Sequence, residues 1–469
     1  MNRVVRKPSR EGTPPMIIIQ ESADALKRFL KLSDLSYTAN LMLMRMVLCF
    51  IAHRGKMSCM QASSMIASDS LHRSQLTRFL ARGRWKSRGL NQPMRAALLK
   101  LESLKGVFIF IVDATLTSQQ GKLTENTFSV QNRKQRGSKR KRHGKRKYPG
   151  KKCHSFTFGL LITPSGIRIP YQIPFKTVEY CKEHGLDRMT TAEAAAEMIK
   201  LLPLPPESQV VVLGDTAYDS EVVRKACEER GYTWIFPANA SRVFAGPQGK
   251  RPTLRSRLQT WSKLSLKKIR LQASSGKFVN HRRLSAYRLG PKLKPRVYYA
   301  YEETREVKSV GSVRIVYSTT KEKLEKATAD DVKILLTNAK GMSLTEVLDL
   351  YSLRWQIELF FKELKSTLGF DHYSFKRFEA VLGWTEAAIT AFLYLEYERA
   401  KRIADRTLAE ETQQWWRIQR CHGLCQAVQM SLKKQELKYM HDRLKTSGGI
   451  AKLQRLLLNA LPNEYRMSA

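Results

Sequence analysis

Two short, uninterrupted apolar runs restrict the fold of this chain more than any other feature. They are Val107–Val112 and Val210–Leu213. Each has the length of a strand and lacks the alternation expected when one face of a strand meets water. Such runs are typical of strands buried on both faces, in a sheet that helices cover. Because helical patterns over residues 191–202 and 220–230 flank the second run, we expect an α/β fold.

The segments beside these runs predict a mixed sheet. Residues 154–163 and 167–175 predict an antiparallel hairpin next to the first strand, and residues 232–236 predict a further strand. The order of three strands, helix, strand, helix and strand resembles that of a ribonuclease-H-like layer. Residues 239–336 lose this alternation and carry β-leaning runs, so we expect a β-rich insertion subdomain there. The catalytic core would therefore comprise residues 105–238 and 337–380.

Helical patterns flank this core on both sides. Residues 1–16 predict a disordered basic tail, residues 17–104 a helical domain, and residues 381–469 a helical C-terminal region. Within the N-terminal part, residues 60–67 and 71–81 around a short turn predict a helix–turn–helix. Three polar side chains near the outer side of its second helix would suit a DNA-reading helix: Arg73, Gln75 and Arg78. Many helical pairs share this pattern without touching DNA, so a purely structural pair stays open.

The charge balance points to a polyanionic partner. The chain has 83 Lys and Arg against 41 Asp and Glu, a formal net charge of +42. Such an excess repels itself unless a polyanion is the usual partner, and nucleic acid fits best because cations release counterions from phosphates. A membrane is the weaker alternative, since the best apolar run, residues 41–52, is short and broken by Arg45. Scattered cysteines and the absence of a secretion signal favour the cytoplasm.

A segment of low complexity over residues 133–152 interrupts the link between the first strand and its hairpin partner. It holds twelve Lys or Arg in twenty residues. A solvated loop and a phosphate-binding arm are compatible interpretations of such a run. The candidate DNA-binding side chains in it are Arg133, Lys134, Lys139, Arg140, Lys141, Arg142, Lys145, Arg146 and Lys147.

A helix is predicted through residues 351–365. Ser343 and Glu346 form a capping box upstream, and Gly369 is a natural stop. At about 100° per residue, four side chains fall within an arc of roughly 60°, and apolar side chains occupy the adjoining arc. The four are Tyr351, Arg354, Glu358 and Lys365. An amphipathic helix with surface ion pairs is the simple alternative.

Carboxylates at the ends of the two apolar runs suggest metal chemistry. Asp113 and Asp215 follow neighbouring buried strands, where they would repel each other unless a cation lay between them. Two Mg²⁺ ions could activate a water or a 3′-hydroxyl and stabilise the leaving oxygen, given a third carboxylate. Glu358 is the candidate, since Glu363 points to roughly the opposite side of its helix. Asp219 is expected to cap the helix that follows it.

These residues resemble a known family. The spacing Tyr351-x2-Arg354-x3-Glu358-x6-Lys365 matches the Y-R-E-K signature of bacterial insertion-sequence DDE transposases of the cut-and-paste type. The aspartates stand in similar settings, Ile111-Val-Asp113-Ala-Thr and Leu213-Gly-Asp215-Thr-Ala-Tyr, and the gap before Glu358 resembles the family's β-rich insertion. The resemblance covers about residues 105–368. It implies a fold of the retroviral-integrase superfamily.

The resemblance also implies roles for these side chains. Asp113, Asp215 and Glu358 would be the catalytic residues and would bind two Mg²⁺ ions, which Mn²⁺ could replace. Tyr351, Arg354 and Lys365 would contact phosphates near the cleaved bond. The substrates would be double-stranded DNA, namely the terminal inverted repeats of a mobile element and its target, held by a homodimer on DNA in the bacterial nucleoid. Some members form a hairpin with a flipped base stacked on a tryptophan, for which the candidates here are Trp261 and Trp355.

Three alternatives stay open. A catalytically silent repressor would bind the element's ends without cutting them, although an intact set of three carboxylates argues against lost activity. A protein that coats nucleic acid through charge alone would leave the spacing from Tyr351 to Lys365 to chance. A metal-dependent nuclease without strand joining would use the same carboxylates, and the reaction products distinguish it from a transposase.

Overall fold

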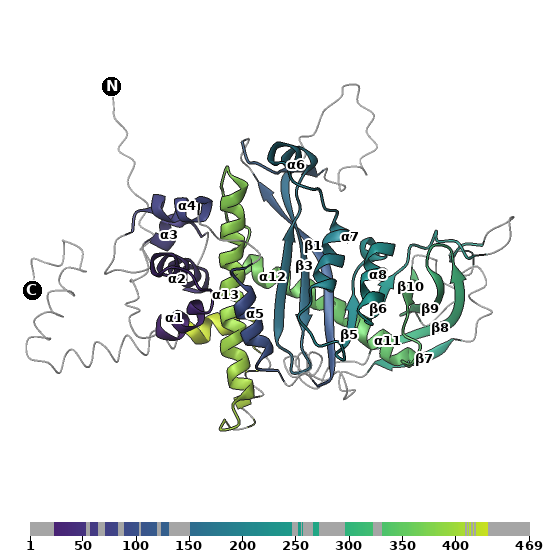
Figure 1. Ribbon diagram of the computed structural model, residues 1–469. Coiled ribbons are helices and arrows are strands. Elements are labelled where there is room, and N and C mark those ends of the chain that lie inside the picture. Colours follow the sequence, from purple (N-terminus) through teal and green to yellow (C-terminus); the bar gives the residue numbers. More distant parts are fainter. Residues whose placement is uncertain are drawn as a thin grey trace, which may run out of the picture.

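Ten strands of the described chain form one mixed sheet (Figure 1). The computed structural model describes residues 23–52, 57–63, 71–82, 89–102, 105–119, 123–130, 151–245, 252–254, 256, 266–271, 296–321, 331–408, 410, 412–413, 416 and 419–429. The strands are β1 (Val107–Gln119), β2 (Phe128–Val130), β3 (Lys151–Ile162), β4 (Arg168–Pro174), β5 (Gln209–Leu213), β6 (Thr233–Pro237), β7 (Lys267–Leu271), β8 (Arg296–Val307), β9 (Gly311–Thr319) and β10 (Lys333–Thr337).

The strands lie in the order β2-β3-β1-β5-β6-β10-β9-β8-β7, with β4 paired to β3 outside this path. β1, β5 and β6 are parallel neighbours, and the other pairs are antiparallel. β3 and β4 confirm the predicted hairpin, and Gly166 in its turn has a φ of +91° that favours glycine. The centre of the sheet is therefore a parallel unit within the predicted mixed sheet.

Helices cover both sides of the central strands. In Figure 1, α7 and α8 lie on one side of β1, β3 and β5, and α5 and α13 lie on the other. The helices are α1 (Ala23–Lys31), α2 (Tyr37–Ala52), α3 (Cys59–Ser63), α4 (Arg73–Arg82), α5 (Gln92–Leu99), α6 (Val178–His184), α7 (Thr191–Lys200), α8 (Glu221–Glu229), α11 (Leu344–Tyr351), α12 (Trp355–Ser366) and α13 (Phe378–Ala404). This arrangement buries the two apolar runs on both faces.

The β-rich region over residues 239–336 contributes β7, β8 and β9, but these strands do not form a separate sheet. β9 pairs with β10, and β10 pairs with β6, so hydrogen bonding continues from the central strands to β7. The expected boundary between residues 336 and 337 falls inside β10. The region thus extends the main sheet at one end.

The long helix α13 joins the N-terminal helices to the sheet. It contacts α2 and α4 among the N-terminal helices, and α5, α12 and β4 nearer the sheet. In Figure 1, α1–α4 lie beyond α13 as seen from the sheet. α13 is also long and apolar enough to cross a membrane by length and composition, yet 89% of the tested stretch is buried inside the described protein, as in a core helix.

A glycine in α13 permits the close approach of α4. A Cβ added to Gly383 would lie 2.8 Å from the backbone oxygen of Leu80, which cannot move without the helix. Gly383→Ala is therefore expected to destabilise the protein by about 1–3 kcal/mol through overpacking. Chemical denaturation measures this loss. The matched control is Gly341→Ala, because the space around Gly341 is open; equal stability of the two variants would contradict the tight contact.

Candidate active site

Asp113 and Asp215 lie at equivalent positions on neighbouring parallel strands. The register of β1 and β5 ends with Ile111 opposite Leu213, and each aspartate comes two residues later. Parallel strands are spaced about 4.8 Å apart, so the two carboxylates belong to one edge of the central unit. The expectation that the first strand ends at Asp113 is wrong, because β1 continues to Gln119. β1 continues because its pairing with β3 extends beyond the end of its pairing with β5, as far as the pair Gln119 and Lys152.

The third carboxylate arrives on a helix with a break in it. The capping box of Ser343 and Glu346 is confirmed at the start of α11. Residues 352–354 then form one 3-10 turn before α12 begins, so the predicted single helix is two α-helices joined by a tighter turn. α12 contacts β1, which brings Glu358 to the strand that carries Asp113.

Arg354 lies between two of the three carboxylates. Its guanidinium donates a hydrogen bond to Glu358, and its Nη1 lies 3.6 Å from Oδ2 of Asp113. Burial alone would lower the pKa of Arg354, but the hydrogen bond to Glu358 and the nearby negative charge raise it. The arginine therefore stays charged and neutralises part of the carboxylate cluster.

The electrostatics place Asp113 at the centre of the cluster. Burial raises its pKa from 3.8 to about 6, and the charges of Asp215 and Glu358 add to the rise. The amide of Ala114, 2.7 Å from Oδ1, and the charge of Arg354 oppose it. A carboxylate that is this costly to ionise marks a site built for chemistry or for a cation.

Lys333 adds a second cation to the site, and the neutral phenol of Tyr351 lies beside it. Nζ of Lys333 lies 4.7 Å from the ring centre of Tyr351. Burial and the charge of Arg354 lower the pKa of Lys333, whereas burial raises that of Tyr351 to about 12. The sequence interpretation missed Lys333, because a lysine at the start of a strand carries no signal that it faces a helix beginning eleven residues later. The pair borders a pocket of about 330 Å³ between β8–β10 and α11–α12.

Lys365 and Trp355 differ in their relation to the carboxylates. Lys365 donates from Nζ to the backbone oxygen of Leu116 at 2.7 Å, which holds it against β1 three residues past Asp113. Burial lowers its pKa. The indole of Trp355 is 56% exposed and lines the pocket beside Arg354. An exposed aromatic ring next to an arginine is available for stacking.

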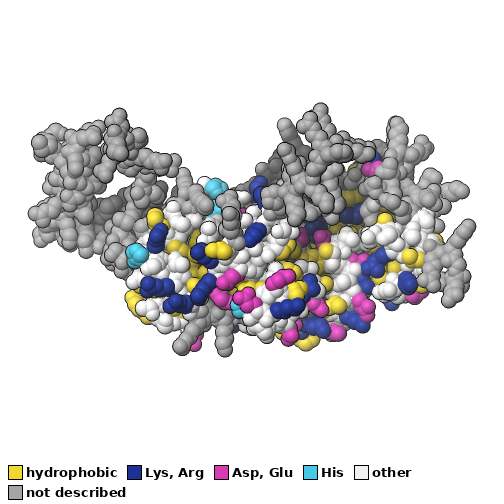
Figure 2. Space-filling view, turned by 90° about the horizontal axis from the view of Figure 1, so that it is seen from above, with side chains coloured by type: hydrophobic (Ala, Val, Ile, Leu, Met, Phe, Trp, Pro, Cys, Tyr) yellow, Lys and Arg dark blue, Asp and Glu magenta, His cyan; other side chains and the backbone are white. Residues whose placement is uncertain are grey.

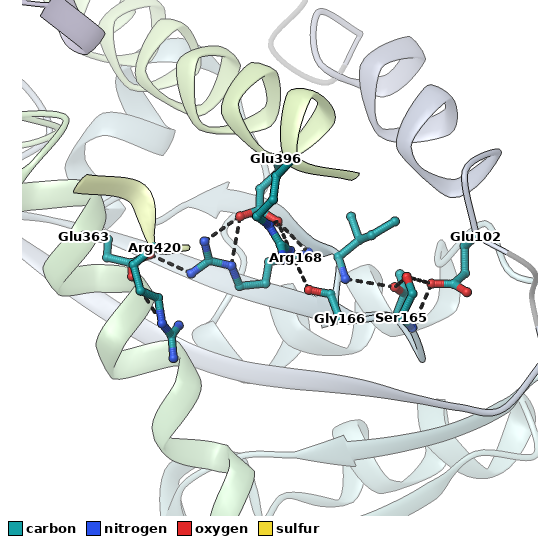
Figure 3. A network of polar contacts seen from close by, with 10 residues as sticks. Glu102, Ser165, Gly166, Arg168, Glu363, Glu396 and Arg420 are labelled. Atoms are coloured by element: carbon teal, nitrogen blue, oxygen red, sulfur yellow. Dashed lines mark hydrogen bonds and ion pairs between the residues drawn. The ribbon is translucent and has the colours of Figure 1, made fainter. Parts of the chain in front are cut away.

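A buried ion-pair network connects α12 to β4 and α13 (Figure 3). Glu363 of α12 accepts a 2.6 Å hydrogen bond from Arg168 of β4, which also pairs with Glu396 of α13. Arg399 of α13 also binds Glu396. Glu363 thus points away from the carboxylate cluster, as its position on the helix predicts. The network holds α12, and with it Glu358, at a fixed place against the sheet.

Asp219 does not cap α8, so that prediction is wrong. Ser220 is the cap, and its hydroxyl accepts from the amide of Val223. Asp219 is instead buried between Arg224 and Arg242, which lies 2.7 Å from its Oδ2. Ion pairs with these two cations offset the cost of burying the carboxylate. Through them Asp219 connects α8 to the segment after β6.

The carboxylates suit a divalent ion in part. Oδ1 of Asp215 accepts from the amide of Ala217, and its other oxygen has no partner among the described residues. Oxygen ligands of this kind, supplemented by phosphate and water, are what Mg²⁺ prefers. Within the described ranges no group of three His, Cys, Asp or Glu side chains stands ready to hold a metal, and Glu358 is paired with Arg354 instead. Asp113 and Asp215 are therefore the two carboxylates of the cluster that fit a divalent ion best, while Glu358 is engaged by Arg354.

The remaining predicted DNA contacts have different outcomes. Arg73, Gln75 and Arg78 are exposed on α4, which with α3 forms two neighbouring helices, while the turn between them lies outside the described residues. Trp261 and the whole basic segment over residues 133–150 also lie outside them. The structure therefore leaves those roles as predictions.

The fold and the site together define the class of protein. A mixed α/β domain that presents aspartates on two central strands and a glutamate on a following helix is the arrangement of a DDE enzyme. The model of the family described as Transposase DDE domain matches residues 109–393, which include all three carboxylates. The chain belongs to this family, and it is a DDE-type transposase whose substrate is DNA. A comparison with curated proteins finds no match.

Proposed function

We propose that this transposase binds the ends of its mobile element, cleaves the DNA by two-metal phosphodiester chemistry and joins the 3′ ends to target DNA. The observation that carries the proposal is the position of Arg354 between Asp113 and Glu358. It supports the proposal because a guanidinium suited to bind phosphate lies beside carboxylates suited to bind metal.

The side chains have separate tasks in this proposal. Asp113, Asp215 and Glu358 hold two Mg²⁺ ions, which when bound activate the attacking hydroxyl and stabilise the leaving oxygen. Arg354 forks onto the phosphate, and the phenol of Tyr351 donates one further bond. Release of Arg354 to the DNA frees Glu358 to face the ions. The core would be of the ribonuclease-H-like type, with the Y-R-E-K signature of bacterial insertion sequences.

Other parts of the chain would hold the DNA away from the chemistry. α4 would recognise the element's end, and the basic segment over residues 133–152 would grip the backbone. Trp355 would stack a flipped base if a hairpin forms, because it is exposed beside Arg354. Two ends must be brought together, so we expect a homodimer on DNA in the bacterial cytoplasm.

The test is strand cleavage with Mg²⁺ on DNA that carries the gene's own flanking ends. Wild type is compared with Glu358→Gln, and the products are resolved on denaturing gels. Cuts at the element boundary by wild type alone, with a loss of at least about a thousandfold in the variant, are expected. Mn²⁺ should replace Mg²⁺, and chelation should stop the reaction.

Two results would favour the rival functions. Equal binding of both proteins to the ends without any cut would identify a silent repressor. Cuts without joined products, when target DNA is supplied, would identify a nuclease that lacks strand transfer.

A further inference from the structure

A groove separates the N-terminal helices from the segment that links α12 to α13. It has a volume of about 820 Å³ and lies between α3–α4 and residues 372–377. Four arginines line it: Arg73, Arg78 and Arg82 from α4, and Arg377 from the catalytic part. We call it the arginine groove. No aspartate or glutamate lines it, and none of the four arginines has a carboxylate partner in the part of the chain that the structure describes.

The two walls of the arginine groove are held together as one unit. The amide of Met57 donates to Nδ1 of His372 at 3.2 Å, which joins the start of α3 to the opposite wall. Deeper in, Trp384 donates from Nε1 to the backbone oxygen of Gly369 at 3.3 Å. The close contact of Gly383 with Leu80 fixes α4 against α13. The groove is therefore preformed, and the backbone positions that carry its four arginines are fixed relative to one another.

The lining of the arginine groove suits the phosphates of a DNA backbone. Its arginines extend along α4 from Arg73 in the first turn to Arg82 in the last, and Arg377 lies in the other wall. Ser74 and Thr77 supply hydroxyls between the arginines, as phosphate sites commonly do. In Figure 2 acidic side chains gather in the middle of the face seen from above, and basic ones are spread around them. A polyanion would meet repulsion there but not in the arginine groove.

The floor of the arginine groove is connected to the active-site strand. Tyr373 lies in its wall, and the phenol oxygen is hydrogen-bonded to Thr117 of β1 and lies 2.9 Å from Nδ1 of His154. Thr117 comes four residues after Asp113 on the same strand. DNA held in the groove would thus be fixed relative to the carboxylates through one rigid strand.

We infer that the arginine groove is a composite site for the duplex of the element's end, in which α4 and the catalytic part grip the same stretch of backbone. The inference rests on the proposed function. It adds that the fold sets the distance along the DNA between the stretch bound in the groove and the cleaved bond. This follows because Arg377 belongs to the same catalytic part of the protein as the three carboxylates. Arg82 and Arg377 become DNA contacts beside Arg73 and Arg78.

The experiment measures duplex binding by fluorescence anisotropy over a series of NaCl concentrations. The probe is a duplex that carries the gene's own flanking end, and the variants are Arg78→Ala and Arg377→Ala. Each variant is expected to weaken binding about tenfold. The slope of log affinity against log salt concentration should also fall by about one in magnitude, which corresponds to one lost phosphate contact. The control is Arg406→Ala, an exposed arginine beyond the far end of α13, about 40 Å from Arg377; it should bind like wild type.

Hydroxyl-radical footprinting then decides whether one groove is involved. Both variants should lose protection over the same few nucleotides of backbone, and Arg377→Lys should restore part of it. Wild-type affinity of Arg377→Ala, losses at unrelated positions, or tighter binding of an RNA of equal length would overturn the inference. Thermal melting verifies that each variant is folded. If Glu358-dependent cutting persists while the groove variants bind normally, the proposed function stands and the groove inference fails.

Discussion

Asp113→Asn is expected to abolish cleavage and, at the same time, to stabilise the metal-free protein. Activity should fall at least about a thousandfold, because an amide is a poor ligand for Mg²⁺ at a site that needs charge. Stability should rise because the wild-type carboxylate is held where burial and two further carboxylates disfavour its charge. A pKa raised from 3.8 to about 6 corresponds to about 3 kcal/mol. The side chain is 19% exposed, so with screening we expect about 1–2 kcal/mol.

The size of this stability difference depends on pH in a defined way. Below pH 3.8 both folded and unfolded chains hold the proton on Asp113, so wild type and Asp113→Asn should be equally stable. Between pH 3.8 and about 6 the unfolded chain releases the proton first, and wild type loses stability relative to the variant as the pH rises. Above pH 6 the difference should stay constant.

Thermal melting with and without Mg²⁺ checks both parts of this prediction. Added Mg²⁺ should raise the melting temperature of wild type, because binding to the folded state stabilises it, and should leave the variant unchanged. A variant that is less stable than wild type at pH 7 without metal would show that Asp113 is a structural residue. An equal response of both proteins to Mg²⁺ would argue against metal binding at Asp113.

The sequence could predict this cluster because its parts depend on local rules. Two apolar runs predict adjacent buried strands, and residues two positions past the shared register must lie together. The spacing of Tyr351, Arg354 and Glu358 predicts one side of a helix, and although a 3-10 turn divides that helix, Arg354 still pairs with Glu358. The extension of β1 to Gln119 escaped prediction because the residues after Asp113 are largely polar, and pairing with β3 sustains the strand.

Contacts between segments far apart in the chain could not be predicted from the sequence, because they depend on how the elements are arranged in space. Lys333 reaches Tyr351 only because β10 lies between β6 and β9, an order that no local pattern gives. The arginine groove combines α4 with Arg377, nearly three hundred residues later in the chain. Asp219 was predicted as a helix cap because aspartate generally favours that position. In the structure its carboxylate is instead buried in ion pairs with Arg224 and Arg242. Local preference predicted that a helix begins near residue 220, and only the ion pairs formed in the folded chain explain why Asp219 is buried.

Glu396→Gln is expected to destabilise the protein by about 3–5 kcal/mol, the loss typical of a broken buried ion pair. Glu396 has no exposed surface and binds both Arg168 and Arg399. Burial alone would raise its pKa, but these two arginines lower it to about 2. An amide in its place keeps the shape, leaves Arg168 with Glu363 alone and removes the carboxylate partner of the buried Arg399.

The pH dependence and a neighbouring glutamate make this prediction specific. A lowered pKa stabilises the fold above the unfolded value of 4.5, and that stability is lost as the pH falls from 4.5 towards 2. The gap between wild type and Glu396→Gln should therefore narrow over this range. Glu398→Gln is the matched control on the same helix, since Glu398 pairs with the more exposed Lys401 and Arg402 and should cost at most about 1 kcal/mol. Equal losses in urea denaturation would contradict a dominant buried network. A larger loss for Glu396→Gln, together with reduced cleavage by a folded sample, would show that the network also positions Glu358 through α12.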